Sequence, residues 1–126
     1  MRKISRRVLA VLFFLLPGLG FGADQFAIAA DGEQAEAQIA KLAGVAPYFH
    51  LYDIDGNLLE VLPNPHLDME YGIGPACAVT LADMGVTVLV ARRIPGPKME
   101  EVLNEREVRI VRRIGTVQDV VNELRE

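Results

Sequence analysis

Residues Val86 to Ala91 (VTVLVA) form a run of apolar, mostly β-branched side chains with no charge in it. A strand of this composition buries both of its faces, which is typical of a parallel strand inside a sheet. Because both faces of such a strand must be covered, helices are expected on the two sides of that sheet. This run therefore directs the chain towards the α/β class.

The rest of the chain alternates between strand and helix patterns. Strands are predicted at 25–30, 48–54, 58–62 and 108–111. Between the second and third of these, Asp55-Gly56 is typical of a hairpin turn. Helices are predicted at 33–43, 76–84, 97–105 and after Thr116, which fits a capping box with Asp119. Pro and Gly recur from 63 to 75 and predict a loop. The order predicts a three-layer α/β domain with a mixed five-stranded sheet flanked by helices.

The first 22 residues have the composition of a secretory signal peptide. The first seven contain four basic residues and no acid, and an apolar run from 8 to 16 follows before Pro17, Gly18 and Gly20. This run is shorter than the roughly 20 residues that a membrane-spanning helix needs. We expect cleavage after Gly22, which leaves residues 23–126 as one domain that is periplasmic or secreted.

Two alternatives concern this leader. The stretch Ser5-Arg6-Arg7-Val8-Leu9 resembles a twin-arginine signal, which exports proteins already folded. The Leu- and Phe-rich run after it favours the ordinary secretory route instead. An uncleaved leader would act as an N-terminal anchor. No contact with the membrane is expected beyond the leader.

Charge and cysteine content exclude several classes of function. Without the four basic residues of the leader, nine basic residues remain beside 17 acidic ones, a formal charge of −8. Such a domain is not expected to bind nucleic acid or anionic lipid through charge. Its single cysteine cannot form an internal disulfide, so the hydrophobic core must hold the exported domain. The sequence indicates no particular oligomeric state.

Cys77 is the only thiol of the chain. If Pro75 is the first helical residue, as its preference for that position suggests, Cys77 is the third. There the helix dipole would lower the pKa of the thiol and favour the thiolate, which is a metal ligand. The alternative interpretation is a small buried residue that packs against the sheet.

Three further residues complete the set of candidate ligands. His66 and Met69 lie in the predicted loop with acidic neighbours, and Cys77 follows eleven residues after His66. Imidazole and soft sulfur suit a transition metal or a cluster edge, although the spacing matches no established zinc or iron–sulfur pattern. We predict Cys77, His66 and Met69 as cofactor-binding residues, and Cys77, His66 and His50 as metal ligands. The alternatives are a solvated loop histidine for His66 and a hydrogen-bonded strand residue for His50.

Other polar residues are candidates for catalysis or anion binding. Asp31 and Asp53 could contribute to a two-metal nuclease site, but the acidic surface opposes a nucleic acid substrate. Arg92-Arg93 and Arg112-Arg113 each follow a predicted strand, and would gather at one edge to bind an anion if the two strands are parallel neighbours. They could equally pair with Glu100, Glu101 and Glu107. No nucleophile–base–acid set and no phosphate loop is present, so we expect a protein that is not an enzyme.

Several short motifs occur in an order that is similar to one family. They are Ile28-Ala29-Ala30-Asp31-Gly32, the segment 46–56 (APYFHLYDIDG), Asn64-Pro65, Gly72-x-Gly74 and Leu81-Ala82-Asp83-Met84-Gly85-Val86. Gly96-Pro97-Lys98 and Gly115-Thr116-Val117 continue the series. Together they resemble the dinitrogenase iron–molybdenum cofactor biosynthesis family, small accessory proteins of the NifX and NafY kind. The resemblance implies a ribonuclease-H-like fold, an iron–sulfur or iron–molybdenum-type cluster as cofactor, and a metal-delivering protein as partner.

One motif of that family is absent. Where the family commonly carries His-Phe-Gly, whose histidine is a favoured cluster ligand, this chain reads Leu42-Ala43-Gly44. Two functions follow from the residues present. The first is a non-enzymatic binding or carrier protein for a metal or metal–sulfur cluster, with its site in the loop 63–75 and at the start of the next helix. The alternative is a metal-free protein-interaction or sensor module on the same scaffold.

Overall fold

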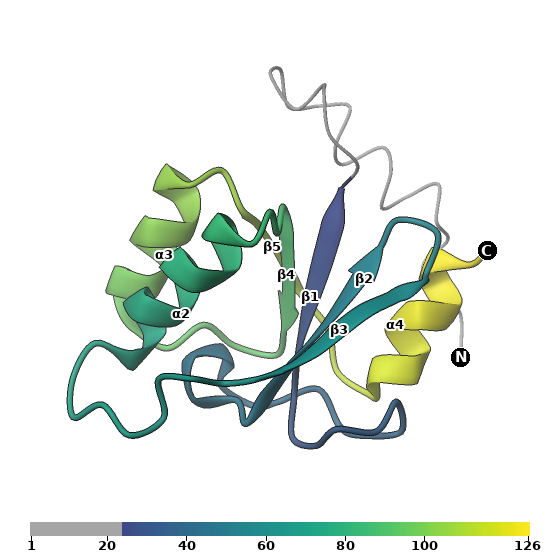
Figure 1. Ribbon diagram of the computed structural model, residues 1–126, viewed down its shortest axis with the longest axis horizontal. Helices are drawn as coiled ribbons and strands as arrows, with labels where there is room; N and C mark the ends of the chain where they lie inside the picture. Colours follow the sequence, from purple (N-terminus) through teal and green to yellow (C-terminus); the bar gives the residue numbers. More distant parts are fainter. Residues whose placement is uncertain (1–23) are drawn as a thin grey trace.

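The computed structural model describes residues 24–126, and the predicted leader, 1–22, lies outside this part (Figure 1). The described chain forms five strands and three α-helices. In order they are β1 (Gln25–Ala30), the 3-10 turn η1 (Ala43–Val45), β2 (Tyr48–Asp53), β3 (Leu58–Pro63), α2 (Ile73–Asp83), β4 (Val88–Ala91), α3 (Gly96–Glu105), β5 (Arg109–Arg112) and α4 (Val117–Leu124). None of the helices in residues 24–126 has the length and hydropathy that crossing a membrane requires.

The five strands form one mixed sheet in the order β3-β2-β1-β4-β5. The first three are antiparallel neighbours, whereas β1, β4 and β5 are parallel. The predicted hairpin is present, and its turn is fixed by Asp53, whose Oδ1 accepts hydrogen bonds from the backbone N–H groups of Asp55 and Asn57, each at 2.9 Å. The predicted mixed five-stranded α/β sheet is therefore confirmed.

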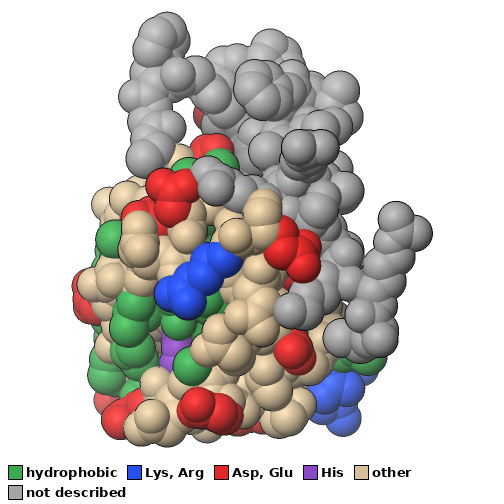
Figure 2. Space-filling view, turned by 90° about the vertical axis from the view of Figure 1, so that its right-hand side faces the viewer, with side chains coloured by type: hydrophobic (Ala, Val, Ile, Leu, Met, Phe, Trp, Pro, Cys, Tyr) green, Lys and Arg blue, Asp and Glu red, His purple; other side chains and the backbone are tan. Residues whose placement is uncertain are grey.

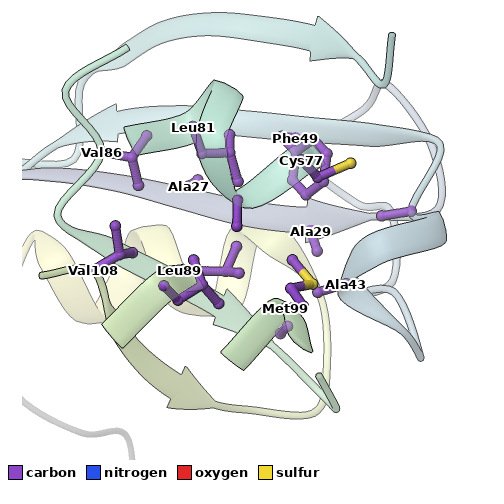
Figure 3. Close-up of a cluster of buried hydrophobic side chains, with 14 of the residues drawn as sticks. Ala27, Ala29, Ala43, Phe49, Cys77, Leu81, Val86, Leu89, Met99 and Val108 are labelled. Carbon is purple, nitrogen blue, oxygen red and sulfur yellow. The ribbon is translucent and has the colours of Figure 1, made fainter. Parts of the chain in front are cut away.

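Helices cover both faces of this sheet. Figure 1 shows α2 and α3 on one side and α4 on the other. The central strand β1 alternates between them: Ala27 and Ala29 pack into the cluster under α2 and α3, part of which is drawn in Figure 3. Phe26 and Ile28 pack into the cluster under α4. The small alanines let the backbones of α2 and α3 approach the sheet, while the larger side chains fill the other face.

The apolar run 86–91, which predicted the α/β class, forms the buried strand β4 as expected. In β4, Leu89 faces α2 and α3, whereas Val88 and Val90 face α4. The strand begins at Val88, two residues later than the apolar run, because Val86 closes the turn after α2 with its N–H bonded to the carbonyl of Leu81 at 3.0 Å.

The helix predicted at 33–43 is wrong. This segment forms turns that lead into η1. Its backbone groups find partners in distant parts of the chain: the N–H of Ile39 donates to Gly115 at 2.8 Å, and that of Ala40 donates to Ala29 at 2.8 Å. Ile39 is completely buried under α4. Because these tertiary bonds satisfy the backbone, no helical ladder is needed.

The last helix confirms its predicted capping box. The hydroxyl of Thr116 accepts a hydrogen bond from the backbone N–H of Asp119 at 3.2 Å, and Oδ2 of Asp119 accepts one from the N–H of Thr116 at 2.9 Å. These two bonds satisfy donors that the first turn of a helix leaves open. The capping box therefore fixes the start of α4 directly after Thr116.

Candidate functional site

Four loops meet beyond the carboxyl ends of the parallel strands. They are residues 31–47, 64–72, 92–95 and 113–116, and we call them together the loop edge; it forms the lower side of Figure 1. In open α/β sheets, ligands bind at this edge where neighbouring strands lead the chain in opposite directions. Here that point lies between β1 and β4, because the chain leaves β1 towards β2 and returns to β4 on the other side. The fold thus places the candidate site next to the end of β1.

A shallow hollow opens at this point. Its volume is about 140 Å³, and it is lined by Asp31, Ala40, Lys41, Leu42, Val45 and Ala46. A water molecule takes about 30 Å³ in the liquid, so the hollow can hold a small inorganic group together with a few waters. Leu42 is part of this lining, so the hollow has an apolar wall there.

Close backbone packing fixes the floor of the loop edge. A Cβ atom added to Gly44 would lie 2.9 Å from Cα of Gly74 and 3.0 Å from Cγ of Pro95. Both neighbours are rigid groups, so only glycine fits at this contact. Gly44 therefore joins η1 to the first turn of α2 and to the chain that enters α3.

A buried asparagine holds the same segments together and was not predicted as a site residue. Nδ2 of Asn64 donates to the carbonyls of Gly44 at 3.2 Å and Ala46 at 2.9 Å. Its Oδ1 accepts from the backbone N–H of His66 at 2.9 Å and lies 3.3 Å from Sγ of Cys77. The only sequence signal for this role was the Asn-Pro pair directly after a strand.

Cys77 lies in the hydrophobic core and is 1% exposed. The helix α2 begins at Ile73, earlier than predicted, so Cys77 is its fifth residue and lies in the cluster that Figure 3 shows. Burial raises the pKa of the thiol, and the hydrogen bond to Asn64 offsets this only in part. The predicted lowering of the thiol pKa at the helix start is therefore wrong, and the neutral thiol is the stable form.

His66 and Met69 lie on the loop edge, as predicted. Nε2 of His66 lies 2.7 Å from Oγ1 of Thr80, which ties the loop to the flank of α2. Met69 is 39% exposed. The backbone N–H of His66 and the thiol of Cys77 both contact Oδ1 of Asn64.

His50 lies elsewhere. It is 1% exposed, and its Nε2 lies 2.8 Å from the carbonyl oxygen of Gly32. Its register partner is Ile28, which faces α4, whereas Cys77 packs on the opposite face of the sheet. The structure therefore does not bring together the three predicted metal ligands. Within residues 24–126, no three His, Cys, Asp or Glu side chains gather where they could hold a metal ion.

The two aspartates weighed for a nuclease site are also separated. Asp53 pairs in register with Gln25 at the start of β1, whereas Asp31 follows the end of that strand. Two carboxylates at opposite ends of a six-residue strand cannot hold ions about 4 Å apart. Asp53 instead serves the hairpin turn, where hydrogen bonds from Asn57 lower the pKa of its carboxyl.

The four arginines lie at the same edge of the sheet, as their sequence positions predicted, but Arg112 and Arg113 turn to opposite faces, towards α3 and α4. The strands β4 and β5 are parallel neighbours with Ala91 opposite Arg112. Two of the arginines have acidic neighbours: Arg112 lies 3.9 Å from Glu100, and Arg113 lies 3.7 Å from Glu123. The side chains of Arg92 and Arg93 are exposed and make no ion pair or hydrogen bond within the described residues.

The fold is similar to that of small α/β domains with known structures. The apo form of the orange protein from Desulfovibrio gigas is 23% identical and has a TM-score of 0.73, with 80% of this chain and 86% of that chain covered. PH0822 is 22% identical, with a TM-score of 0.65 and coverage of 78% and 86%. A NifB-like protein from Thermotoga, described as a member of the DUF35 family, is 28% identical, with a TM-score of 0.67 and coverage of 79% and 84%.

The family follows from the sequence match itself. The family model described as dinitrogenase iron-molybdenum cofactor matches residues 24–126, which is the whole of the described domain. This chain belongs to that family, and the resemblance stated from its motifs is confirmed. None of the curated proteins compared with the chain matches it significantly.

Proposed function

We propose that this protein is a non-enzymatic carrier that binds a metal or a metal–sulfur cluster, of the iron–sulfur or iron–molybdenum type, as its cargo. A metal-delivering protein would be its partner. The observation that carries the proposal is the match of the whole domain to a family named for the dinitrogenase iron-molybdenum cofactor. The open hollow at the strand ends is a suitable place for such a cargo. The finer fold class that we propose is ribonuclease-H-like.

The predicted ligand residues differ in how readily they could contact a cargo at the loop edge. His66 and Met69 lie on the loop edge and could reach a cargo there after a local change in the loop. Cys77 is a neutral thiol beneath the same edge, so its ligation would require α2 and Asn64 to separate. His50 is fixed by Gly32 on the far face. We propose His66, Met69 and Cys77 as the residues to test first, and a structural role for His50.

A specific observation favours the alternative function, a metal-free interaction or sensor module. Five large apolar side chains of the loop edge are between 39% and 84% exposed: Val45, Leu67, Met69, Tyr71 and Ile114. Exposed apolar groups that share one edge of a small domain are typical of a surface that contacts another protein. A carrier also needs such a contact in order to transfer its cargo, so the two functions share this surface.

The proposed location is outside the cytoplasm, in the periplasm or secreted, after removal of the leader at residues 1–22. The composition of those residues supports this proposal. Intact-mass measurement of the protein recovered from a cell fraction tests it. Loss of the first 22 residues in an extracytoplasmic fraction is the expected result. A full-length chain in the membrane fraction would support the anchored alternative, and a full-length chain in the cytoplasm would contradict export.

Anaerobic reconstitution with iron and sulfide tests the carrier function. Metal content and the visible absorption spectrum would be measured for the wild type, Cys77→Ser and His66→Gln, with His50→Gln as the control on the far face of the sheet. Stoichiometric metal with a sulfur-to-metal charge-transfer band is the expected result. Loss of the band in Cys77→Ser, with retention in His50→Gln, would place the site at α2. Wild-type protein without metal above background would contradict the proposal for simple iron–sulfur clusters and favour the metal-free alternative.

A further inference from the structure

The segment 67–71, with the sequence Leu67-Asp68-Met69-Glu70-Tyr71, is exposed at every position. It lies in the loop between β3 and α2, which extends outwards at the lower left of Figure 1. Its three large apolar side chains are 46% exposed in Leu67, 39% in Met69 and 84% in Tyr71. Single exposed apolar residues are common on protein surfaces, but several within one short segment are typical of a surface that contacts another molecule.

The base of this segment is fixed by hydrogen bonds. The N–H of Met69 donates to the carbonyl of His66 at 3.1 Å, which closes a tight turn. Nε2 of His66 lies 2.7 Å from Oγ1 of Thr80 on α2, and the backbone N–H of His66 donates to Asn64. A surface that is ordered before binding loses less conformational entropy when a partner binds. The segment is therefore a preorganised contact surface.

The charge of the segment indicates which kind of partner fits it. No lysine or arginine occurs between Lys41 and Arg92, whereas six acidic residues do. Asp68 and Glu70 belong to this stretch, and their side chains make no ion pair or hydrogen bond within the described residues. On the face that Figure 2 shows, by contrast, acidic side chains are scattered among other groups. Two unpaired carboxylates between three exposed apolar groups complement a surface that is both cationic and apolar.

We propose that the segment 67–71 is the docking surface for a partner protein, which contacts it with a basic and apolar surface. Leu67 and Tyr71 supply apolar contact area, while Asp68 and Glu70 attract cationic side chains and orient the partner. This inference rests on the proposed function, which needs a protein contact at the loop edge, and it specifies the surface and the chemistry of the partner. A metal ion does not account for the two carboxylates, since no three metal-binding side chains gather within residues 24–126.

Titration of the full-length protein with short synthetic peptides, followed by fluorescence anisotropy, tests the inference. The probe is a peptide of alternating lysine and leucine. One reference peptide has glutamate in place of lysine, and the other has serine in place of leucine. We expect saturable binding of the lysine–leucine peptide and about tenfold or weaker binding of both references. The affinity should fall as the salt concentration rises, because the carboxylates are exposed to solvent.

One pair of matched variants tests the contribution of charge. Asp68→Asn/Glu70→Gln should weaken binding of the lysine–leucine peptide about fivefold, as expected for the loss of two exposed charge pairs. Glu101→Gln/Glu105→Gln removes the same charge from exposed positions of α3 and should leave the affinity nearly unchanged. Equal losses in the two double variants would show that only the overall charge of the protein attracts the peptide, and would overturn the docking surface.

A second pair of variants tests the apolar contribution. Leu67→Ser/Tyr71→Ser should weaken binding about tenfold, since an aromatic side chain commonly dominates a protein contact. Leu58→Ser/Leu59→Ser removes two leucines of β3 that are 54% and 51% exposed, and should leave the affinity unchanged. Equal losses in these two variants would also overturn the docking surface. Circular dichroism of each variant verifies that it is folded.

The outcomes separate this inference from the proposed function itself. Absence of saturable binding, or equal affinity for the lysine–leucine peptide and either reference, would overturn the docking surface. If reconstitution with iron and sulfide still succeeded in that case, the carrier function would stand without it. If the peptide bound through the segment 67–71 while reconstitution failed, the docking surface would stand and the metal-free alternative would be favoured.

Discussion

The two ends of the sheet differ in how their polar groups are satisfied. At the loop edge, the side chains of Arg92 and Arg93 make no ion pair or hydrogen bond within the described residues, and five large apolar side chains are exposed. The opposite end, which we call the turn edge, consists of the turns 54–57, 84–87 and 106–108. There Asp53 accepts hydrogen bonds from its own turn, and Arg125 donates to the carbonyl of Gly56 at 3.0 Å.

This difference indicates which end of the sheet has side chains available for a ligand. The turn edge satisfies its polar groups through local bonds, such as those that Asp53 accepts within its own turn, and through the contact of Arg125 with Gly56. The loop edge is longer and is held together from beneath by Asn64 and Gly44, while the side chains of Arg92 and Arg93 stay unpaired within the described residues. A rigid base with free outer groups is the arrangement that binding sites on loops require.

Removal of the Asn64 side chain should have the largest effect on stability. Asn64→Ala leaves two carbonyls and one N–H of the loop edge without their partner. We expect the free energy of unfolding to fall by about 3 kcal/mol, since each unsatisfied buried group costs about 1–3 kcal/mol. Chemical denaturation at neutral pH measures it.

The matched variant at the turn edge is Asn57→Ala, which removes an exposed hydrogen bond to Asp53 of 3.0 Å. Its cost should be within about 0.5 kcal/mol. Equal losses of stability in the two variants would contradict the difference between the two edges.

Gly44→Ala should have the second largest effect. The added methyl group would collide with the backbone of Gly74 and the ring of Pro95. We expect a loss of about 2 kcal/mol, as is common when a well-packed site is overfilled. Gly32→Ala is the control, because its new Cβ would meet Ala37 at an ordinary 3.5 Å. If both variants unfolded at the same temperature as the wild type, the packing of Gly44 against Gly74 and Pro95 would be looser than these distances indicate.

Cys77 should make stability depend on alkaline pH. Burial raises the pKa of its thiol above the value of 9.0 that the unfolded chain has. Its contribution is therefore fully present below pH 9.0 and is lost as pH rises through the folded pKa. The difference in unfolding midpoint between the wild type and Cys77→Ala, measured from pH 7 upwards, should become smaller above that point. A difference that stays constant with pH would indicate a thiol that is not desolvated.

Asp53 should show the smallest effect, at acid pH. The hydrogen bonds from Asn57 lower the pKa of its carboxyl below 3.8. The stability that this contributes is present above pH 3.8 and is lost as pH falls through the folded pKa. The carboxyl is fully exposed, so the effect should be slight. Titration followed by NMR should give a low pKa in the wild type that rises towards 3.8 in Asn57→Ala; an unchanged pKa would show that the turn backbone alone is responsible.

Much of the fold could be predicted because its signals are local. The apolar run before Ala91, the Asp55-Gly56 turn and the capping box at Thr116 each involve residues that are close in sequence. The gathering of the four arginines followed from them, since parallel neighbouring strands end at the same edge. The family resemblance was also available from motif order alone.

Local patterns in the sequence predicted the five strands, the three α-helices, the α/β class and the residue types near the site. Which of these elements and residues contact one another depends on the packing of distant segments. Residues 33–43 form loops because their backbone groups bond to distant segments, as the N–H of Ile39 does to the carbonyl of Gly115. His50 and Cys77 lie on opposite faces of the sheet. Tertiary packing also makes Asn64 the centre of the loop edge and leaves Arg92 and Arg93 without partners among residues 24–126. Burial and hydrogen bonds between distant segments set the charge state of a side chain and the groups that it can contact. Local sequence encodes neither the burial nor these bonds.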